Sequence, residues 1–561
     1  MTRIIFIAIV LVLLLPTIPI TAQDSNWEPP FEVSSVERTP SSWFPDLAAG
    51  PDDSIHIIWS SGIANGPNVQ DALDLLMYRS VSDGTWSDIN DIYVPGTGGF
   101  TVRNSMALGQ DGRFHVLLRS LTNIKYTSAP WDEAWSAKAW EEAQRIDNSG
   151  SYYDEIAVDS KGTLHIFWNE SVPNEEDEPY EDCPDCADVF YRYSTNNGET
   201  WSLPFNVSET LDGSTKPQVK LSGDDEIHVV WEEGYDSIVG EGLPTSGYYR
   251  RSRDGGATWD EPSVFTLPDF QPSEEGAGPI PDAPQQMTVG LYQNTAPIIV
   301  YRGTATSQMY YHTSDDGGAN WSEARLLPGA RARYINTTPW DGYTMTTDGD
   351  GKVHFVFSGF PATETDSESK PRLMHMIWNG RSWSAPDVIM DESDYPGWDA
   401  AKISQCEILK EQRINTDEAL NLLEECRLMR RMPEWPNAIV NGSQLHVAWF
   451  TRNDSDTFRS DQGASYQVWY STRQLNASSV ETLTQVEPTA QPTAVAPTAT
   501  PAPEPTPTLP PEVVNAVLPD QPLAWEGPGV ATVAFASLPV LGFLGVVILG
   551  RAFWHRRRTQ R

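Results

Sequence analysis

The chain has 561 residues, of which 77 are acidic and 38 are basic, so its formal net charge is −39. A surface this acidic excludes nucleic acid and anionic lipid as electrostatic partners. The 21 Trp and 20 Tyr residues, together with few helical periodicities, indicate an exported protein rich in β-structure.

The first 22 residues have the layout of a secretory signal peptide. Arg3 precedes an apolar run from Ile4 to Leu15, and small residues end at Ala22. We therefore expect residues 1–22 to be removed and the mature chain to be exported, with an uncleaved anchor as the alternative.

Seven short apolar segments share one pattern along the chain. Six of them carry a histidine at the second position, and the seventh, Pro297 to Tyr301, does not. The six histidines are His56, His115, His165, His228, His354 and His446. The fourth copy is preceded by an apolar run and a Gly/Asp turn and is followed by a third strand, Tyr248 to Ser252, and by a fourth at Trp259. Together these segments make a four-stranded antiparallel meander.

A four-stranded unit of this kind buries its faces only by stacking on its neighbours. Residues 23–480 are therefore predicted to form an all-β domain, a β-propeller of four-stranded antiparallel blades with seven blades, or six as the alternative. Because the histidines recur at one position, we predict that they pack and hydrogen-bond as part of the scaffold and take no part in catalysis.

A second pattern marks the turn between the third and fourth strands. It occurs as STNNGETW from Ser194 to Trp201, SRDGGATW from Ser252 to Trp259 and SDDGGANW from Ser314 to Trp321. At these turns the chain resembles the Asp-box, or BNR-repeat, family of β-propellers, whose best-known members are sialidases. The resemblance implies the fold but little about activity, because in that family the boxes are hairpins away from the catalytic pocket.

The N-terminal segment Asn26 to Ser34 matches Thr200 to Ser208 almost position by position, so it is a fourth strand without its own hairpin. The last repeat, which ends near Thr472, lacks a fourth strand of its own. We predict that the N-terminal strand completes the last blade and so removes two open sheet edges.

One long loop, Asn169 to Asp188, holds nine carboxylates and no basic residue. Such a loop attracts cations, so we consider a calcium site at Glu175, Glu176, Asp177 and Glu178, with a solvated acidic loop as the alternative. No other cofactor is expected.

The four cysteines fall in two places. Cys183 and Cys186 lie in the acidic loop, and Cys406 and Cys426 lie in a helical insert at residues 400–431. Outside the cell, local disulfides are expected, so we predict the pairs Cys183–Cys186 and Cys406–Cys426. A zinc site shared by the four thiols is the alternative.

The C-terminal part predicts a membrane tether. Residues 481–528 form a Pro/Thr-rich stalk without a packed core, with nine prolines between Pro488 and Pro511. Residues 529–550 are predicted to be a transmembrane helix, and the basic residues of 551–561 a cytoplasmic tail. We thus expect a single-pass protein of the cell membrane with a monomeric, extracellular propeller.

A sialidase needs a cluster of arginines to bind the substrate carboxylate. In that family the first of these arginines lies in a Phe-Arg-Ile-Pro-like motif on the first inner strand. Here the corresponding stretch is Ser42-Trp43-Phe44-Pro45, so Trp43 stands where that arginine would be. Residues at the entrances of the inner strands form a mixed aromatic and cationic set that could line a pocket for an anionic sugar or peptide. The candidates are Trp43, Arg103, Tyr153, Lys216, Arg302 and Tyr343.

The leading hypothesis is a surface propeller that binds a glycan or protein ligand without catalysis. The alternatives are an exo-glycoside hydrolase of the sialidase type with relocated catalytic residues, and an assembly scaffold for an envelope complex. If Arg103 and Lys216 line a binding pocket, alanine in their place is expected to weaken an acidic ligand while leaving the melting temperature nearly unchanged.

Overall fold

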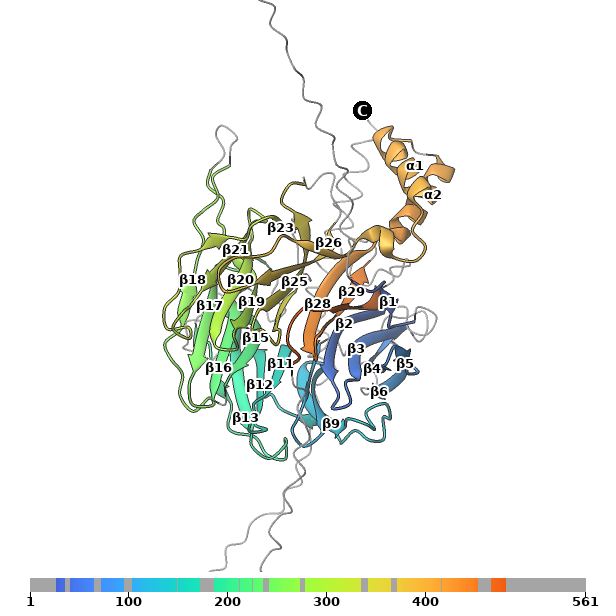
Figure 1. Ribbon diagram of the computed structural model, residues 1–561. Coiled ribbons are helices and arrows are strands. Elements are labelled where there is room, and N and C mark those ends of the chain that lie inside the picture. Colours follow the sequence, from blue (N-terminus) through green and yellow to red (C-terminus); the bar gives the residue numbers. More distant parts are fainter. Residues whose placement is uncertain are drawn as a thin grey trace, which may run out of the picture. The chain divides into compact units, whose positions relative to one another are not determined.

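The computed structural model describes residues 27–35, 41–64, 72–94, 103–148, 150–171, 186–210, 212–223, 225–235, 242–272, 278–333, 342–364, 371–414, 416–452 and 466–480. Within these ranges the chain is mainly antiparallel β-sheet, and the two α-helices form one hairpin (Figure 1). The prediction of an all-β protein with a small helical insert is confirmed. The signal peptide, stalk, membrane span and cytoplasmic tail predicted for 1–22, 481–528, 529–550 and 551–561 lie outside the described residues.

Four sheets contain four strands each, and in every one of them the strands pair antiparallel in chain order. The first of these sheets consists of β7 (Asn104–Leu108), β8 (Arg113–Ser120), β9 (Asn123–Pro130) and β10 (Gln144–Arg145). The second consists of β11 (Ser151–Val158), β12 (Leu164–Ser171), β13 (Ala187–Ser194) and β14 (Phe205–Asn206). The third consists of β15 (Gly213–Ser222), β16 (Glu226–Tyr235), β17 (Ser246–Ser252) and β18 (Ser263–Phe265). The fourth consists of β19 (Pro284–Tyr292), β20 (Ala296–Gly303), β21 (Met309–Thr313) and β22 (Arg325–Leu326).

A fifth sheet has five strands, because both β23 and β24 pair with β25. Its strands are β23 (Ala330–Ala332), β24 (Tyr343–Thr347), β25 (Val353–Pro361), β26 (Arg372–Trp378) and β27 (Asp387–Met390). The sixth sheet has nine strands and consists of two meanders joined by one parallel pairing, Ser41 with Tyr466. One meander is β2 (Ser41–Ala49), β3 (Ile55–Ala64), β4 (Ala72–Ser82), β5 (Thr85–Trp86) and β6 (Asn90–Tyr93); the other is β28 (Met432–Asn441), β29 (Gln444–Arg452), β30 (Tyr466–Gln474) and β1 (Phe31–Glu32).

The N-terminal strand completes the last meander, as the sequence match predicted. In β1, Phe31 pairs with Tyr470 and Glu32 with Trp469 of β30, and Trp27 makes a further bridge to Arg473. The pairing covers the edge of β30, which would otherwise present unpaired N–H and C=O groups to solvent.

The first strands of successive meanders contact one another in a cycle. β2 contacts β7, and the contacts continue through β11, β15, β19, β24 and β28 back to β2. These strands are the ones that carry the candidate site described below.

The recurring histidine connects the second strand of a meander to its third strand. In the meanders that begin with β2, β7, β11, β15 and β28, its Nδ1 lies 2.6–2.8 Å from a tyrosine hydroxyl, in the pairs His56–Tyr78, His115–Tyr126, His165–Tyr191, His228–Tyr249 and His446–Tyr470. In the meander of β25, His375 replaces the tyrosine beside His354. The prediction that these histidines pack and hydrogen-bond is confirmed.

The Asp-box turns then hold neighbouring sheets together. Within the turn that follows β17, Ser252 Oγ accepts from the Gly256 N–H at 2.8 Å and Asp254 Oδ1 accepts from the Thr258 N–H at 2.7 Å, so side chains of the turn itself help to fix the loop. The carbonyl oxygen of Gly255 in this turn accepts a hydrogen bond from the Tyr191 hydroxyl of the preceding sheet at 3.0 Å. Gly256 lies so close to the Tyr191 ring that a Cβ would clash with it, so only glycine fits there.

The helical insert is a hairpin of α1 (Ala400–Glu411) and α2 (Asp417–Met429), which extends away from the sheets (Figure 1). The predicted Cys406–Cys426 disulfide is confirmed, and it joins the two helices at a Cα–Cα distance of 6.6 Å. Cys183 lies outside the described residues, so its pairing with Cys186 stays a prediction. No helix in the described part of the chain combines the length and apolar character needed to cross a membrane.

Candidate functional site

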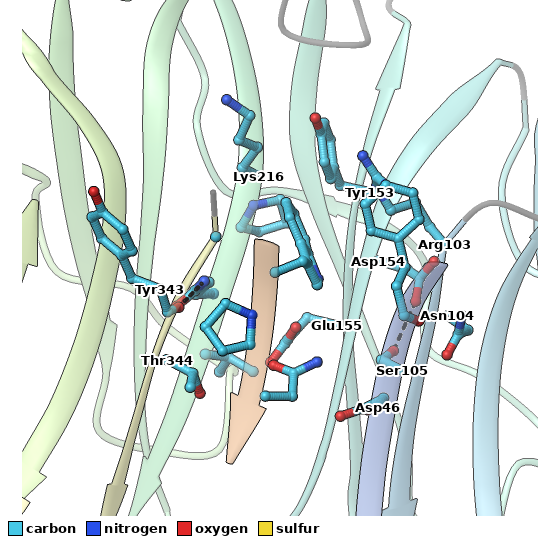
Figure 2. A pocket seen from close by; sticks show the side chains of 18 of the residues that line it. Asp46, Arg103, Asn104, Ser105, Tyr153, Asp154, Glu155, Lys216, Tyr343 and Thr344 are labelled. Atoms are coloured by element: carbon cyan, nitrogen blue, oxygen red, sulfur yellow. Dashed lines mark hydrogen bonds between the residues drawn. The ribbon is translucent and has the colours of Figure 1, made fainter. Parts of the chain in front are cut away.

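A cavity of about 180 Å³ lies where first strands of the cycle meet (Figure 2). Its walls come from β2, β11, β15, β19, β24 and β28, from β7 together with Arg103 just before it, and from Glu232 of β16. In Figure 2 the side chains of Lys216, Tyr153 and Tyr343 extend toward one end of this space, whereas Asp46 and Ser105 lie toward the other. The cavity therefore has a cationic and aromatic end and a carboxyl-rich end.

A β-bulge recurs in five of these first strands and aims side chains into the cavity. The pairing register shifts between Trp43 and Asp46 in β2, because two residues there oppose a single residue of β3. The other shifts lie between Ser151 and Asp154, Thr215 and Gln218, Gln285 and Thr288, and Glu434 and Asn437. In four of the bulges one residue has a positive φ of 48–56°, namely Phe44, Lys216, Gln286 and Trp435. A side chain in this backbone region costs on the order of 1–3 kcal/mol, so surrounding contacts must hold the bulges in place.

Arg103 lies among aromatic rings at the edge of the cavity. Its guanidinium carbon is 3.5 Å from the ring centre of Phe44 and 4.8 Å from those of Tyr153 and Trp435. The side chain is only 3% exposed. Cation–π contacts of this kind are strongest where water is excluded, so the rings stabilise the positive charge and fix the position of the guanidinium.

Lys216 forms a buried ion pair in the wall. Its Nζ lies 3.0 Å from Glu232 Oε2 and 3.1 Å from the Tyr235 hydroxyl. Burial alone would lower the pKa of Lys216, but the Glu232 carboxylate and the Tyr235 hydroxyl outweigh it, and the pKa is raised. The other carboxylate oxygen, Glu232 Oε1, accepts from the Gln286 N–H at 2.7 Å, so the pair also ties β16 to the bulge of β19.

Three carboxyl groups line the other part of the cavity, and each is half-buried because one side faces the open space. Burial raises the pKa of Asp46 to about 6, although the Met106 and Leu47 N–H groups donate to its carboxylate. Burial also raises the pKa of Asp154 to about 7, against a hydrogen bond of 2.8 Å from Ser105 Oγ. The pKa of Glu155 rises to about 8 for the same reason. The site therefore holds both charged and protonated carboxyl groups near neutral pH.

The structure brings four of the six predicted site residues together. Arg103, Tyr153, Lys216 and Tyr343 all line the cavity. Trp43 does not line it, because the bulge turns the following residue, Phe44, toward the cavity. The Trp43 ring is 1% exposed and packs edge-on against Tyr466 at 5.5 Å.

Arg302 is also away from the cavity. It is fully buried, and its Nη1 donates to the Arg333 carbonyl oxygen at 2.8 Å. The structure thus places Trp43 and Arg302 in the scaffold, while ligand binding by the other four residues stays a prediction.

Sequence reasoning missed Phe44, Asp46, Asp154, Glu155 and Trp435, which also line the cavity. A signal for two of them was present, since Asp154 and Glu155 interrupt an otherwise apolar and aromatic first strand. The predicted calcium ligands Glu175, Glu176, Asp177 and Glu178 lie outside the described residues. Among the residues that the structure does describe, no group of three or more His, Cys, Asp or Glu side chains is placed to hold a metal ion.

Comparison with known proteins confirms the Asp-box motif. The family model of the BNR/Asp-box repeat matches residues 192–203. No curated protein sequence matches the chain.

Several solved structures are similar at low identity. A Dyadobacter fermentans protein of unknown function is 12% identical, with 80% of this chain and 98% of that chain covered and a TM-score of 0.41. The NanB sialidase from Streptococcus pneumoniae is 12% identical, with coverages of 80% and 70% and a TM-score of 0.38. The α-L-arabinofuranosidase Arb93A from Fusarium graminearum, in complex with an iminosugar inhibitor, is 12% identical, with coverages of 63% and 98% and a TM-score of 0.38. Similarity this weak carries no argument about activity.

Proposed function

We propose that this Asp-box repeat protein is a seven-bladed β-propeller that binds a glycan in the cavity between its first strands, without cleaving it. The observation that carries the proposal is the convergence of Arg103, Tyr153, Lys216 and Tyr343, from four different meanders, on one cavity. These residues are far apart in the chain, and the contacts among the first strands bring them together.

The cycle of contacts among first strands supports a blade count of seven. Seven first strands, β2, β7, β11, β15, β19, β24 and β28, take part in it, and β28 contacts β2. The pairing of β1 with β30 gives the last meander its fourth strand. An experimental structure with six blades would contradict this count.

The size and lining of the cavity favour a sugar over a protein segment as ligand. A volume of about 180 Å³ is smaller than the roughly 300–1,000 Å³ of sites that enclose a drug-sized molecule, so one terminal sugar residue is the better fit. Tyr153, Tyr343 and Trp435 contribute aromatic groups to the lining, and the carboxyl, amide and hydroxyl groups offer hydrogen bonds. This mixture suits a sugar ring, which has both apolar faces and hydroxyl groups.

Two observations favour binding over hydrolysis of the sialidase type. Arg103 is the single arginine among the described residues that line the cavity, whereas sialidases use an arginine cluster. The Tyr235 and Glu232 side chains are hydrogen-bonded, but Tyr235 is 1% exposed and its pKa is raised, chiefly by burial and further by Glu232. A tyrosine with these properties is a poor nucleophile.

Hydrolysis by other residues is the second candidate function, and the three carboxyl groups favour it. A carboxyl group with a pKa near 7 or 8 is protonated at neutral pH and can donate a proton to a leaving group, while one with a lower pKa can act as base or nucleophile. Asp154 or Glu155 would then be the acid and Asp46 the second carboxylate. This alternative is a glycoside hydrolase with catalytic residues unlike those of sialidases.

The two candidates are separated by measuring binding and turnover on the same protein. We expect the full-length chain to retain glycans on an array and Asp154→Asn to lose most of that binding, whereas Asp269→Asn, an exposed control away from the cavity, binds normally. Both changes are isosteric, so they remove a charge without opening a cavity. Fluorogenic glycosides, sialosides first, are expected to remain uncleaved; cleavage that Glu155→Gln abolishes would establish the hydrolase instead.

Display at the cell surface is also part of the proposal. It rests on the signal layout of residues 1–22 and on the apolar segment 529–550 with its basic tail. Extracellular protease applied to intact cells is expected to release the propeller, because the proposed topology places the Pro/Thr-rich segment outside the cell. Protection of the whole chain would contradict surface display.

A further inference from the structure

A second and larger cavity, of about 1040 Å³, lies where the last meander meets the first. Its walls come from the turn between β2 and β3, the turn between β4 and β5, and the turn between β28 and β29, together with parts of β1 and β30. We call this space the seam groove, because the cycle of first strands closes between β28 and β2. The apolar and aromatic side chains of its wall are Pro29, Phe31, Ile55, Val81, Trp86 and Tyr470.

Three other junctions between sheets are filled by a tyrosine that contacts the next Asp-box turn. In each, the tyrosine hydroxyl donates to a carbonyl oxygen of the turn at 2.9–3.5 Å, and a Cβ on a glycine of the turn would clash with the tyrosine. The glycine–tyrosine pairs are Gly198–Tyr126, Gly256–Tyr191 and Gly318–Tyr249. At the seam groove the turn at Asp83 and Gly84 is shorter. No atom of the described residues beyond its chain neighbours lies within 4 Å of a Cβ placed on Gly84, so the groove takes the place of the contact that these three junctions have.

The chain that follows β30 runs along the turns between first and second strands. The Ser478 N–H and hydroxyl donate to Asp350 Oδ1 at 3.0 and 2.8 Å, and the Val480 N–H donates to the Gly442 carbonyl oxygen at 2.7 Å. Asp350 lies in the turn between β24 and β25, and Gly442 lies in the next such turn of the cycle, between β28 and β29. The following turn, between β2 and β3, lines the seam groove. The described chain therefore passes from one turn to the next toward the groove, and Ser479 and Val480 already line it.

Residues 481–489 come next in the sequence and lie outside the described residues. Their sequence suits an extended segment with one apolar face. Leu483 and Val486 follow Val480 at intervals of three. A polyproline II helix has three residues per turn, so in that conformation the three side chains share a face. Pro488 also favours an extended backbone at the residue before it.

We propose that residues 481–489 dock in the seam groove and place Leu483 and Val486 against its apolar wall. A segment of this chain is the occupant that the course of the backbone favours, because the chain reaches the groove at Val480 and its next residues are tethered there. Tethering raises the effective concentration of the segment, so a small apolar contact suffices. The inference goes beyond glycan binding and does not depend on it.

Docking fixes the start of the stalk at one end of the sheets. The turns between first and second strands follow the ends of the first strands, and in β2 this end, at Ala49, lies beyond Asp46. Lys216 and Tyr153 lie near the starts of β15 and β11 and extend toward the opposite end of the central cavity (Figure 2). Docking thus keeps residues 481–489 away from the cationic and aromatic end of that cavity.

The test joins the segment to the groove by a disulfide. The full-length protein in detergent micelles carries Pro29→Cys, an exposed position in the groove wall, and Gln485→Cys, which leaves Leu483 and Val486 in place. After mild oxidation, peptide mapping is expected to show an intramolecular link between these two positions. The matched control is Leu203→Cys in place of Pro29→Cys, because Leu203 occupies the corresponding position before a fourth strand and is 86% exposed. No link is expected there.

Two further variants separate docking from mere proximity along the chain. Leu483→Asp with Val486→Asp puts charges on the apolar face, and the link is expected to form at least roughly ten-fold more slowly. Thr482→Asp with Thr484→Asp adds the same charge on the other faces of the segment and should leave the rate unchanged. Equal rates in all these variants, or no link in the parent, overturn the proposal. A link between two molecules would assign the groove to a second copy and overturn it as well.

Discussion

The replacement Lys216→Ala is expected to destabilise the protein strongly, contrary to the expectation from sequence that the melting temperature would stay nearly unchanged. The structure shows Lys216 at 6% exposure and its partner Glu232 at 1%. Alanine removes the ammonium group and leaves the Glu232 carboxylate buried next to the Tyr235 hydroxyl without its cation.

The magnitude follows from the burial of the pair. Removing one partner of a buried ion pair costs roughly 3–5 kcal/mol, because the remaining charge loses its compensation but stays out of water. Exposed pairs, by contrast, contribute about 0–1 kcal/mol. We therefore expect the free energy of unfolding to fall by about 3 kcal/mol or more.

A double-mutant cycle separates the ion pair from simple loss of packing. Glu232→Gln keeps an oxygen that can accept from the Gln286 N–H, which donates to the carboxylate at 2.7 Å. Lys216→Met keeps most of the buried side-chain volume. The double variant is expected to lose less stability than the sum of the single variants, by about 1–3 kcal/mol.

Urea denaturation followed by tryptophan fluorescence measures each free energy of unfolding. A loss below about 1 kcal/mol for Lys216→Ala, the range of an ordinary surface change, would falsify the buried ion pair. It would mean that the lysine extends into the cavity with its charge solvated, and Lys216 would then again be a candidate to bind an anionic ligand.

Three further predictions concern pH, the contacts between sheets and the disulfide. Because the folded pKa values of Asp154 and Glu155, about 7 and about 8, lie above their ordinary values, the folded state holds more protons between about pH 4 and 8. Their contribution to stability therefore falls as pH rises through this window. In urea titrations the free energy of unfolding should fall less with pH for the double variant Asp154→Asn with Glu155→Gln than for the unchanged protein. If both proteins show the same pH dependence of stability, the raised pKa values are wrong. Tyr191→Phe breaks hydrogen bonds to His165 and to the next sheet, so it is expected to lower the free energy of unfolding by about 1–3 kcal/mol. Tyr470→Phe, whose described hydrogen bond is to His446, should lower it less. The reverse order in urea denaturation would contradict the role of the turns. Replacing Cys406 and Cys426 by alanine is expected to increase amide hydrogen exchange in α1 and α2 and to leave the protection of the strands unchanged. The reason is that the disulfide, which closes a sequence separation of 20, contributes on the order of 3 kcal/mol. Exchange that rises throughout the sheets would show that the hairpin supports them.

The repeating pattern of the sequence was sufficient to predict the meanders. An apolar run with a histidine at its second position became the second strand in six places, because a short apolar run that follows a Gly/Asp turn is typical of a hairpin strand. The match between Asn26–Ser34 and Thr200–Ser208 also predicted the pairing of β1 with β30, since both are fourth strands that need the same edge. These predictions depend only on short sequence patterns and on the similarity between two segments of the chain.

The candidate site was predicted only in part. Arg103, Tyr153, Lys216 and Tyr343 were found from their positions at the ends of first strands. Trp43 was expected to line the site, but Phe44 lines the cavity instead, because a bulge adds one residue to the strand and reverses which side chain faces the cavity. The apolar pattern alone does not show that two residues of β2 oppose one residue of β3.

The sequence by itself determined the strands, the Asp-box turns, the closing strand and the disulfide-linked insert, because each depends on short-range patterns or on a match between two segments. Only the tertiary structure decided which side chains meet in the cavity, which cations are already paired, and which carboxyl groups are forced toward their protonated form. Those properties arise where strands from distant parts of the chain come together, and the resulting burial sets the cost of charge at each position.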